Sequence, residues 1–122
     1  MQATIMVVED EPDIRELVTT LLTVEGFTVL SAEDGPDALR QLSDHPEVDL
    51  LFTDIVMPGE LHGFDLARRA REIKPGIKLL YTSGFALSTA LRHSGPVEDG
   101  QVVAKPYRLE QLVDEIRRTL AG

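Results

Sequence analysis

Short apolar runs alternate along the whole chain with segments in which apolar residues recur every three or four positions. Five of the short runs have the length and apolar character of buried strands and are bounded by polar or glycine-containing stretches. These predicted strands are Thr4–Val8, Phe27–Ser31, Asp49–Thr53, Ile77–Thr82 and Gln101–Ala104. We therefore expect one sheet that is assembled from five separate parts of the sequence.

The segments between the strands have the apolar spacing of amphipathic helices. Their apolar stripes span Ile14–Leu22, Pro36–Ser43, Phe64–Ile73 and Leu109–Leu120. Pro12 suits the first turn of the first helix, and Lys74-Pro75-Gly76 would stop the third. From Ser83 to Gly100 the pattern fades, and we expect a short or irregular fourth helix there.

Strands that alternate with helices are typical of a parallel sheet covered by helices on both faces. Right-handed crossovers then give a doubly wound α/β fold, whose functional residues lie beyond the carboxyl ends of the strands. The chain has 122 residues and no linker, repeat or low-complexity segment. We expect a single domain over residues 1–122.

The amino-acid composition and net charge argue against several classes of function. Hydrophobic residues make up 43% of the chain, enough for a core, and no apolar run approaches the roughly 20 residues of a membrane span. The lack of cysteine and of a signal peptide fits a cytoplasmic protein. The net charge of −9 argues against direct binding to nucleic acid or to an anionic membrane. Any phosphate group that this chain binds must therefore be neutralised by one or two specifically positioned cations and not by a basic surface.

Polar residues gather at the predicted carboxyl edge of the sheet. They are Glu9 and Asp10 after the first strand, Asp54 after the third, Thr82 at the end of the fourth and Lys105 after the fifth. If the first and third strands are neighbours, the three carboxylates share one pocket and repel one another unless a cation joins them. Oxygen ligands without Cys or His suit a hard ion, Mg²⁺ above all.

Each of these residues also has an ordinary structural interpretation. Asp10 in "EDEPD" can cap the first helix, and Asp54 can be a turn residue. Thr82 can be a simple β-former and Lys105 a solvated surface charge. Chance would rarely place all of them at the ends of their strands, so we favour a functional site.

Four segments resemble the response-regulator receiver domain of two-component signalling. They are "MVVEDEPDIRELV", "LLFTDIVMPG", "LLYTSGF" and "VVAKPY", which occur in order and at similar spacings over essentially the whole chain. The resemblance implies a flavodoxin-like sheet with strand order 2-1-3-4-5. "LLYTSGFA" and the weak fourth helix are most similar to receivers of hybrid histidine kinases or to stand-alone single-domain receivers.

The resemblance also implies roles at the carboxyl edge. Asp54 would be the phosphoacceptor, with Thr82 and Lys105 contacting the phosphoryl group. The donor would be the phosphohistidine of a histidine kinase or phosphotransfer protein. Self-dephosphorylation would be slow, because Val56 and Gly84 stand where fast hydrolysers often place an amide or an acid.

A Mg²⁺ site is implied by the same resemblance. Its ligands would be Asp10 and Asp54, the backbone carbonyl of Val56, and Glu9 largely through water. The face formed by the fourth helix, fifth strand and last helix would bind a protein partner. It is also a candidate for dimerisation on phosphorylation.

The chain departs from the family pattern mildly at Tyr107, which replaces a frequent phenylalanine, and more clearly at three other places. Glu9 stands where aspartate is commoner, and Val102 stands where many receivers carry a switch aromatic. "MPGELHG" has one more residue between Pro58 and Gly63 than the common form.

Three other classes compete with this interpretation. A flavin-binding electron carrier needs a phosphate loop after the first strand, where this chain has the acidic "EDEPD". An aspartate-nucleophile phosphatase usually has a second acid two residues after the nucleophile, where this chain has Val56. An unphosphorylated pseudo-receiver, acting only as an interaction module, is the third.

Overall fold

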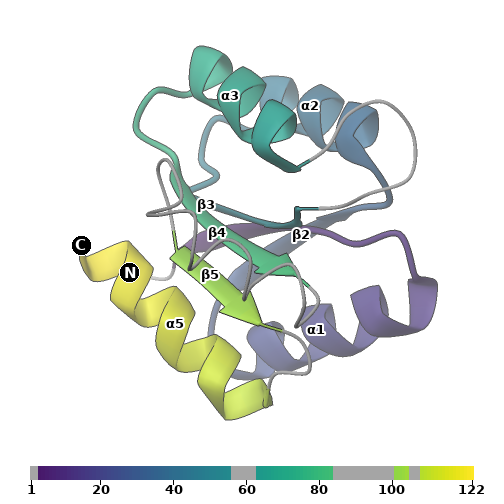
Figure 1. Ribbon diagram of the computed structural model, residues 1–122, viewed down its shortest axis with the longest axis vertical. Helices are drawn as coiled ribbons and strands as arrows, with labels where there is room; N and C mark the ends of the chain where they lie inside the picture. The colour runs from purple at the N-terminus through teal and green to yellow at the C-terminus, as the bar shows by residue number, and fades with distance from the viewer. Residues whose placement is uncertain (1–2, 56–62, 84–100, 105–107) are drawn as a thin grey trace.

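The computed structural model describes residues 3–55, 63–83, 101–104 and 108–122 (Figure 1). The strands are β1 (Thr4–Val8), β2 (Thr28–Ala32), β3 (Leu50–Asp54), β4 (Lys78–Ser83) and β5 (Gln101–Ala104). The helices are α1 (Pro12–Val24), α2 (Gly35–Asp44), α3 (Gly63–Ile73) and α5 (Leu109–Ala121). The expected fourth helix falls within residues 84–100 and so lies outside the described residues.

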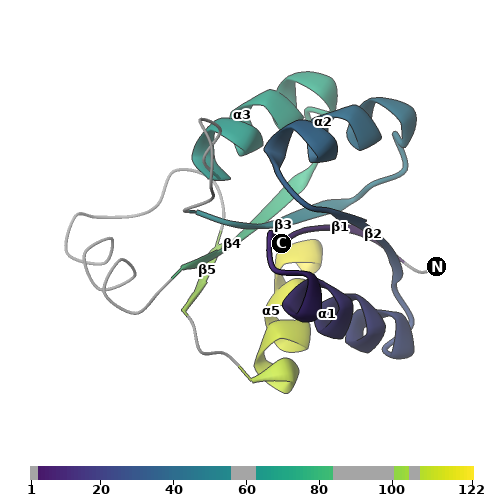
Figure 2. The same cartoon turned by 90° about the vertical axis from the view of Figure 1, so that its right-hand side faces the viewer.

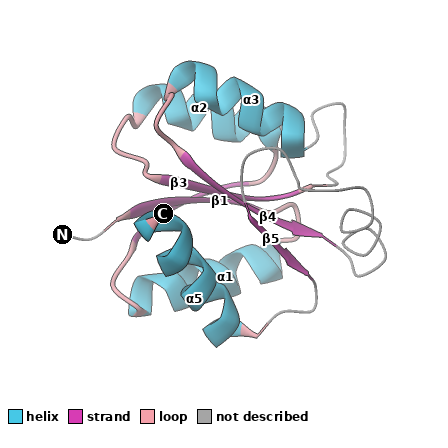
Figure 3. Cartoon of the chain, turned by 60° about the vertical axis from the view of Figure 1, so that its left-hand side comes forward, coloured by secondary structure: helices cyan, strands magenta, loops and turns pink. Residues whose placement is uncertain are grey.

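The five strands form one parallel sheet in the order β2-β1-β3-β4-β5. This confirms the predicted doubly wound fold and its strand order. The crossovers place α2 and α3 on one face of the sheet and α1 and α5 on the other (Figures 2 and 3). None of the helices in the described residues is long and apolar enough to cross a membrane.

The core explains why the strands are apolar on both faces. Alternate side chains of a strand point to opposite faces of the sheet. In β1, Met6 and Val8 join the buried cluster beneath α2 and α3, whereas Ile5 and Val7 join the cluster against α1 and α5. All five residues of β1 are buried, as expected for a strand covered on both sides.

The boundaries of β2, β3 and β4 lie one residue later than predicted, whereas β1 and β5 match. Gly26 has a φ of 101° and reverses the chain after α1, and Phe27 N–H donates to the carbonyl of Leu22 rather than to a strand. Asp49 also stands outside its predicted strand. Its carboxylate accepts a hydrogen bond from the backbone N–H of Thr4, 2.9 Å away, and so fixes the start of β1.

Candidate phosphoacceptor site

The register of the sheet brings three of the predicted residues to one edge. Val8 pairs with Thr53, so Glu9 and Asp54 each follow a matched pair on neighbouring strands. Asp54 itself pairs with Thr82 of β4. Neighbouring strands lie about 4.8 Å apart, so the Asp54 backbone has Glu9 on one side and Thr82 on the other.

Asp54 is the last residue of β3 and is half-buried. Its carbonyl oxygen accepts a hydrogen bond from Thr53 Oγ1 at 3.1 Å. The next backbone N–H, that of Ile55, donates to the carbonyl of Thr82 at 2.9 Å. The backbone around Asp54 is therefore fixed by the sheet, while its side chain stands at the edge where β3 ends.

The two acids that follow β1 differ in exposure. Glu9 is buried; its N–H donates to the carbonyl of Ala32 at 3.1 Å, and its own carbonyl accepts from Arg15 Nη1 at 2.8 Å. Asp10 is exposed. The N-cap of α1 is Glu11, which makes no side-chain capping hydrogen bond, so the interpretation of Asp10 as a helix cap is wrong.

Thr82 is the most informative residue of the edge. Only 4% of its surface is exposed, and among the described residues its Oγ1 has no hydrogen-bond partner. A buried hydroxyl without a partner costs about 1–3 kcal/mol, so each one in a native protein calls for an explanation, such as a catalytic or ligand-binding role. Its place opposite Asp54 suits a hydroxyl that donates to a ligand held by that carboxylate.

The same edge has the donor atoms for a hard cation. Glu9, Asp10 and Asp54 offer only carboxylate oxygens, which Mg²⁺ prefers. In the ranges that the structure describes, no three acidic or histidine side chains already form a metal-binding group. Mg²⁺ does not need such a cage, because it keeps several waters and binds through one or two carboxylates together with phosphate oxygens. The carboxylate oxygens at this edge are therefore suitable ligands for Mg²⁺.

Two predicted site residues, Val56 and Lys105, lie outside the described residues. Their roles stay predictions. Three neighbours of the site were not predicted from the sequence: Thr53 and Gly63, which contact the Asp54 backbone, and Arg15, which contacts Glu9. A glycine that opens a helix and an arginine six residues from its partner are common features, and no sequence pattern marks these contacts.

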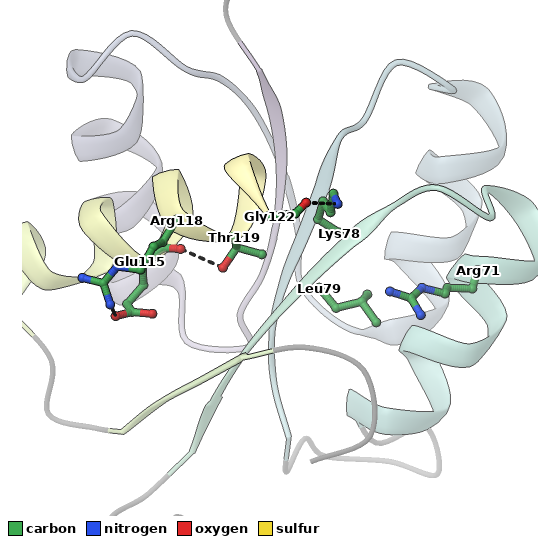
Figure 4. Close-up of a pocket in the computed structure, with 7 residues that line it drawn as sticks. All are labelled: Arg71, Lys78, Leu79, Glu115, Arg118, Thr119 and Gly122. Carbon is green, nitrogen blue, oxygen red and sulfur yellow. Dashed lines mark hydrogen bonds and ion pairs between the residues drawn. The ribbon is translucent and has the colours of Figure 1, made fainter. Parts of the chain in front are cut away.

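A cavity of about 300 Å³ lies at the opposite edge of the sheet, near the start of β4 (Figure 4). Several of its polar groups are paired within the chain: Lys78 Nζ donates to the carbonyl of Gly122, and Arg118 pairs with Glu115, each at 2.7 Å. At this edge the pKa of exposed Glu47 is lowered by hydrogen bonds from its own backbone N–H and from His45. Neither feature belongs to the Asp54 site.

Residues 5–117 match the family model of the response regulator receiver domain. The chain belongs to this family. Receiver domains are the phosphoacceptors of two-component signalling; they use Mg²⁺ at the phosphorylation site and take the phosphoryl group from histidine kinases or phosphotransfer proteins. This confirms the resemblance and sets aside the flavin carrier and the phosphatase.

Similar proteins agree with the receiver assignment. The chain is 39% identical over 116 residues to the response regulator receiver protein CpdR of Brucella abortus, covering 95% of both chains. It is 34% identical to part of the sensor kinase CckA of the same species, covering 97% of this chain and 12% of that protein. These two relatives fit the expected likeness to stand-alone receivers and to receivers of hybrid kinases.

Solved structures extend the likeness to the fold of the receiver domain. The crystal structure of a response regulator receiver protein from Sinorhizobium medicae has a TM-score of 0.84 and 31% identity, covering 99% of this chain and 96% of that one. The receiver domain of the hybrid histidine kinase CckA has a TM-score of 0.79 and 27% identity, covering 97% and 99%.

Proposed function

We propose that this receiver domain, residues 1–122, takes a phosphoryl group on Asp54 in a Mg²⁺-dependent reaction. The observation that carries the proposal is the buried hydroxyl of Thr82. It is paired in register with Asp54 and, within the described part of the chain, has no hydrogen-bond partner. A phosphoryl group on Asp54 would supply the missing acceptor.

The reaction is an in-line transfer. A carboxylate oxygen of ionised Asp54 attacks phosphorus; the new O–P bond forms as the P–N bond to the donor histidine breaks, and the electron pair leaves with the imidazole. Thr82 then donates a hydrogen bond to a phosphoryl oxygen, and Lys105 pairs with the phosphoryl charge. Mg²⁺, held by Asp10, Asp54 and the Val56 carbonyl with Glu9 largely through water, would neutralise charge on the transferring oxygens.

The product would persist, because hydrolysis needs a water placed in line with the O–P bond. Val56 and Gly84 are the residues two positions after Asp54 and Thr82. An apolar side chain and a bare glycine give a water no hydrogen bond. We therefore assign slow self-dephosphorylation to this domain, with Lys105 and the metal still activating phosphorus.

Phosphorylation of Asp54 would change the surface of the domain. A protein partner in the cytoplasm would then bind the changed surface. The proposed face is formed by β5 and α5 together with the expected fourth helix, which lies outside the described residues, and it is also a candidate for phosphorylation-dependent dimerisation. Val102 is half-buried and packs against the core cluster that contains Tyr81. A small valine has no ring to swing inward, so the change would centre on the loop after Thr82.

The test uses acetyl phosphate as a small phosphoryl donor, with intact mass as the readout. With Mg²⁺ the chain should gain one phosphoryl group, and an excess of chelator should prevent this. A chain that gains none, either from acetyl phosphate or from a phosphorylated histidine kinase, would instead be a pseudo-receiver that acts only as an interaction module.

A further inference from the structure

Gly63, the first residue of α3, lies directly against the backbone of Asp54. A methyl group on its Cα would be 2.3 Å from the Asp54 carbonyl oxygen, 3.0 Å from the Asp54 carbonyl carbon and 2.8 Å from the Ile55 Cα. Side-chain carbons do not approach backbone atoms this closely, and no rotamer change relieves a clash with backbone. Gly63 is therefore needed for this close approach.

The peptide that joins Asp54 to Ile55 is held from two sides. From β4, the Thr82 carbonyl accepts the Ile55 N–H at 2.9 Å. From α3, the Gly63 N–H donates to the Ile55 carbonyl, also at 2.9 Å. The position of this peptide, and with it that of the Asp54 Cα, depends on how closely α3 can lie against it.

The start of α3 is itself anchored to the sheet. The ring of Phe64 meets the ring of Tyr81 edge-on, with centroids 4.9 Å apart. One turn further on, Leu66 and Ala67 are buried in the core cluster. An added methyl group at position 63 would thus push apart α3 and the end of β3, both of which are held in place. Part of the resulting displacement would be a shift of the Asp54 backbone.

We propose that Gly63 is a positioning residue for phosphoryl transfer. Because Gly63 has no side chain, the first turn of α3 can lie against the Asp54 backbone and fix its position. That position determines the direction from which the carboxylate attacks phosphorus. The proposal rests on Asp54 being the phosphoacceptor. A displacement of about 1 Å in a reacting group can cost about a hundredfold in rate, so a shift of about half an ångström should cost about tenfold.

The experiment compares Gly63→Ala with Gly76→Ala in labelling by acetyl phosphate and Mg²⁺. Gly76 is the matched control, because a methyl group on its Cα would meet nothing within 4 Å. Rates are measured over a range of acetyl phosphate concentrations, at a temperature where circular dichroism shows each variant to be fully folded. The maximal rate of Gly63→Ala should fall about tenfold or more with little change in the half-saturating concentration, and Gly76→Ala should match wild type.

A purely structural role for Gly63 would lower the melting temperature and leave the maximal rate of the folded protein unchanged. That result, with wild type labelled normally, would overturn this inference alone. An unlabelled wild type would overturn the proposed function and this inference with it.

If Gly63→Ala does not fold, Phe64→Leu and Phe27→Leu decide the question. Both phenylalanines are half-buried, but Phe27 packs in the core cluster on the other face of the sheet. Loosening the start of α3 with Phe64→Leu should slow labelling more than Phe27→Leu does. Equal rates in the two variants would overturn the proposal.

Discussion

Thr82→Val should stabilise the unphosphorylated domain while impairing its chemistry. Valine has the shape of threonine but no hydroxyl, and the Thr82 hydroxyl is buried without a partner among the described residues. Removing an unpaired buried hydroxyl should stabilise the fold by about 1–2 kcal/mol. For a chain of this size that corresponds to a rise of roughly 3–8 °C in melting temperature.

The matched control is Thr53→Val. Thr53 is equally buried and lies in the neighbouring strand, but its hydroxyl donates to the Asp54 carbonyl at 3.1 Å. Losing that hydrogen bond should destabilise the domain by about 0.5–1.5 kcal/mol. Because both substitutions exchange one β-branched residue for another, the contrast isolates the hydrogen bond from strand propensity.

The stabilities of wild type, Thr82→Val and Thr53→Val are compared by thermal and urea unfolding in the absence of a phosphoryl donor. Labelling with acetyl phosphate gives the second readout: Thr82→Val should lose a hydrogen bond to a charged group, worth about 1.5–3 kcal/mol, and be labelled about tenfold more slowly or worse. A Thr82→Val variant that melts below wild type, or that is labelled at the wild-type rate, would refute the reasoning.

Three further outcomes follow from the site. Asp10→Ala should weaken Mg²⁺ binding more than Glu9→Ala, as measured by titration, because Asp10 is the proposed direct ligand; equal losses would place Glu9 in direct contact with the ion. Val56→Asn combined with Gly84→Glu should shorten the lifetime of the phosphorylated form, measured by intact mass over time in the same Mg²⁺, because both new side chains can orient water; an unchanged lifetime would contradict the proposed cause. Phosphorylation should alter amide hydrogen exchange in the loop after Thr82 and on the face of β5 and α5, whereas changes confined to α1 and α2 would argue against that output face.

The sequence pattern was sufficient to predict a parallel, doubly wound sheet and the edge where the site lies. Parallel strands joined by helices bring their carboxyl ends to one edge, so the positions of Glu9, Asp54 and Thr82 at strand ends could be read in advance. The resemblance supplied the order in which the strands lie side by side. Confirmation came from the observed register, in which Asp54 pairs with Thr82.

Contacts that depend on tertiary packing could not be predicted in this way. The approach of Gly63 to Asp54 depends on how α3 settles on the sheet, and nothing in the pattern of α3 distinguishes this glycine from an ordinary helix start. The burial of Glu9 beside the exposed Asp10 also arises from packing, since both are charged residues at the same strand end. Asp49 was assigned to a strand because its neighbours are apolar, yet its carboxylate holds the start of β1.

The central claim is that Asp54 carries the phosphoryl group, and intact mass after incubation with acetyl phosphate and Mg²⁺ tests it most directly. Wild type is compared with Asp54→Asn, and with Asp49→Asn as a control at the residue just before the same strand. An amide is not a competent nucleophile here, whereas an asparagine at position 49 keeps an oxygen that can accept from Thr4. We predict one phosphoryl group on wild type and on Asp49→Asn, and none on Asp54→Asn. Equal labelling of Asp54→Asn would contradict the account.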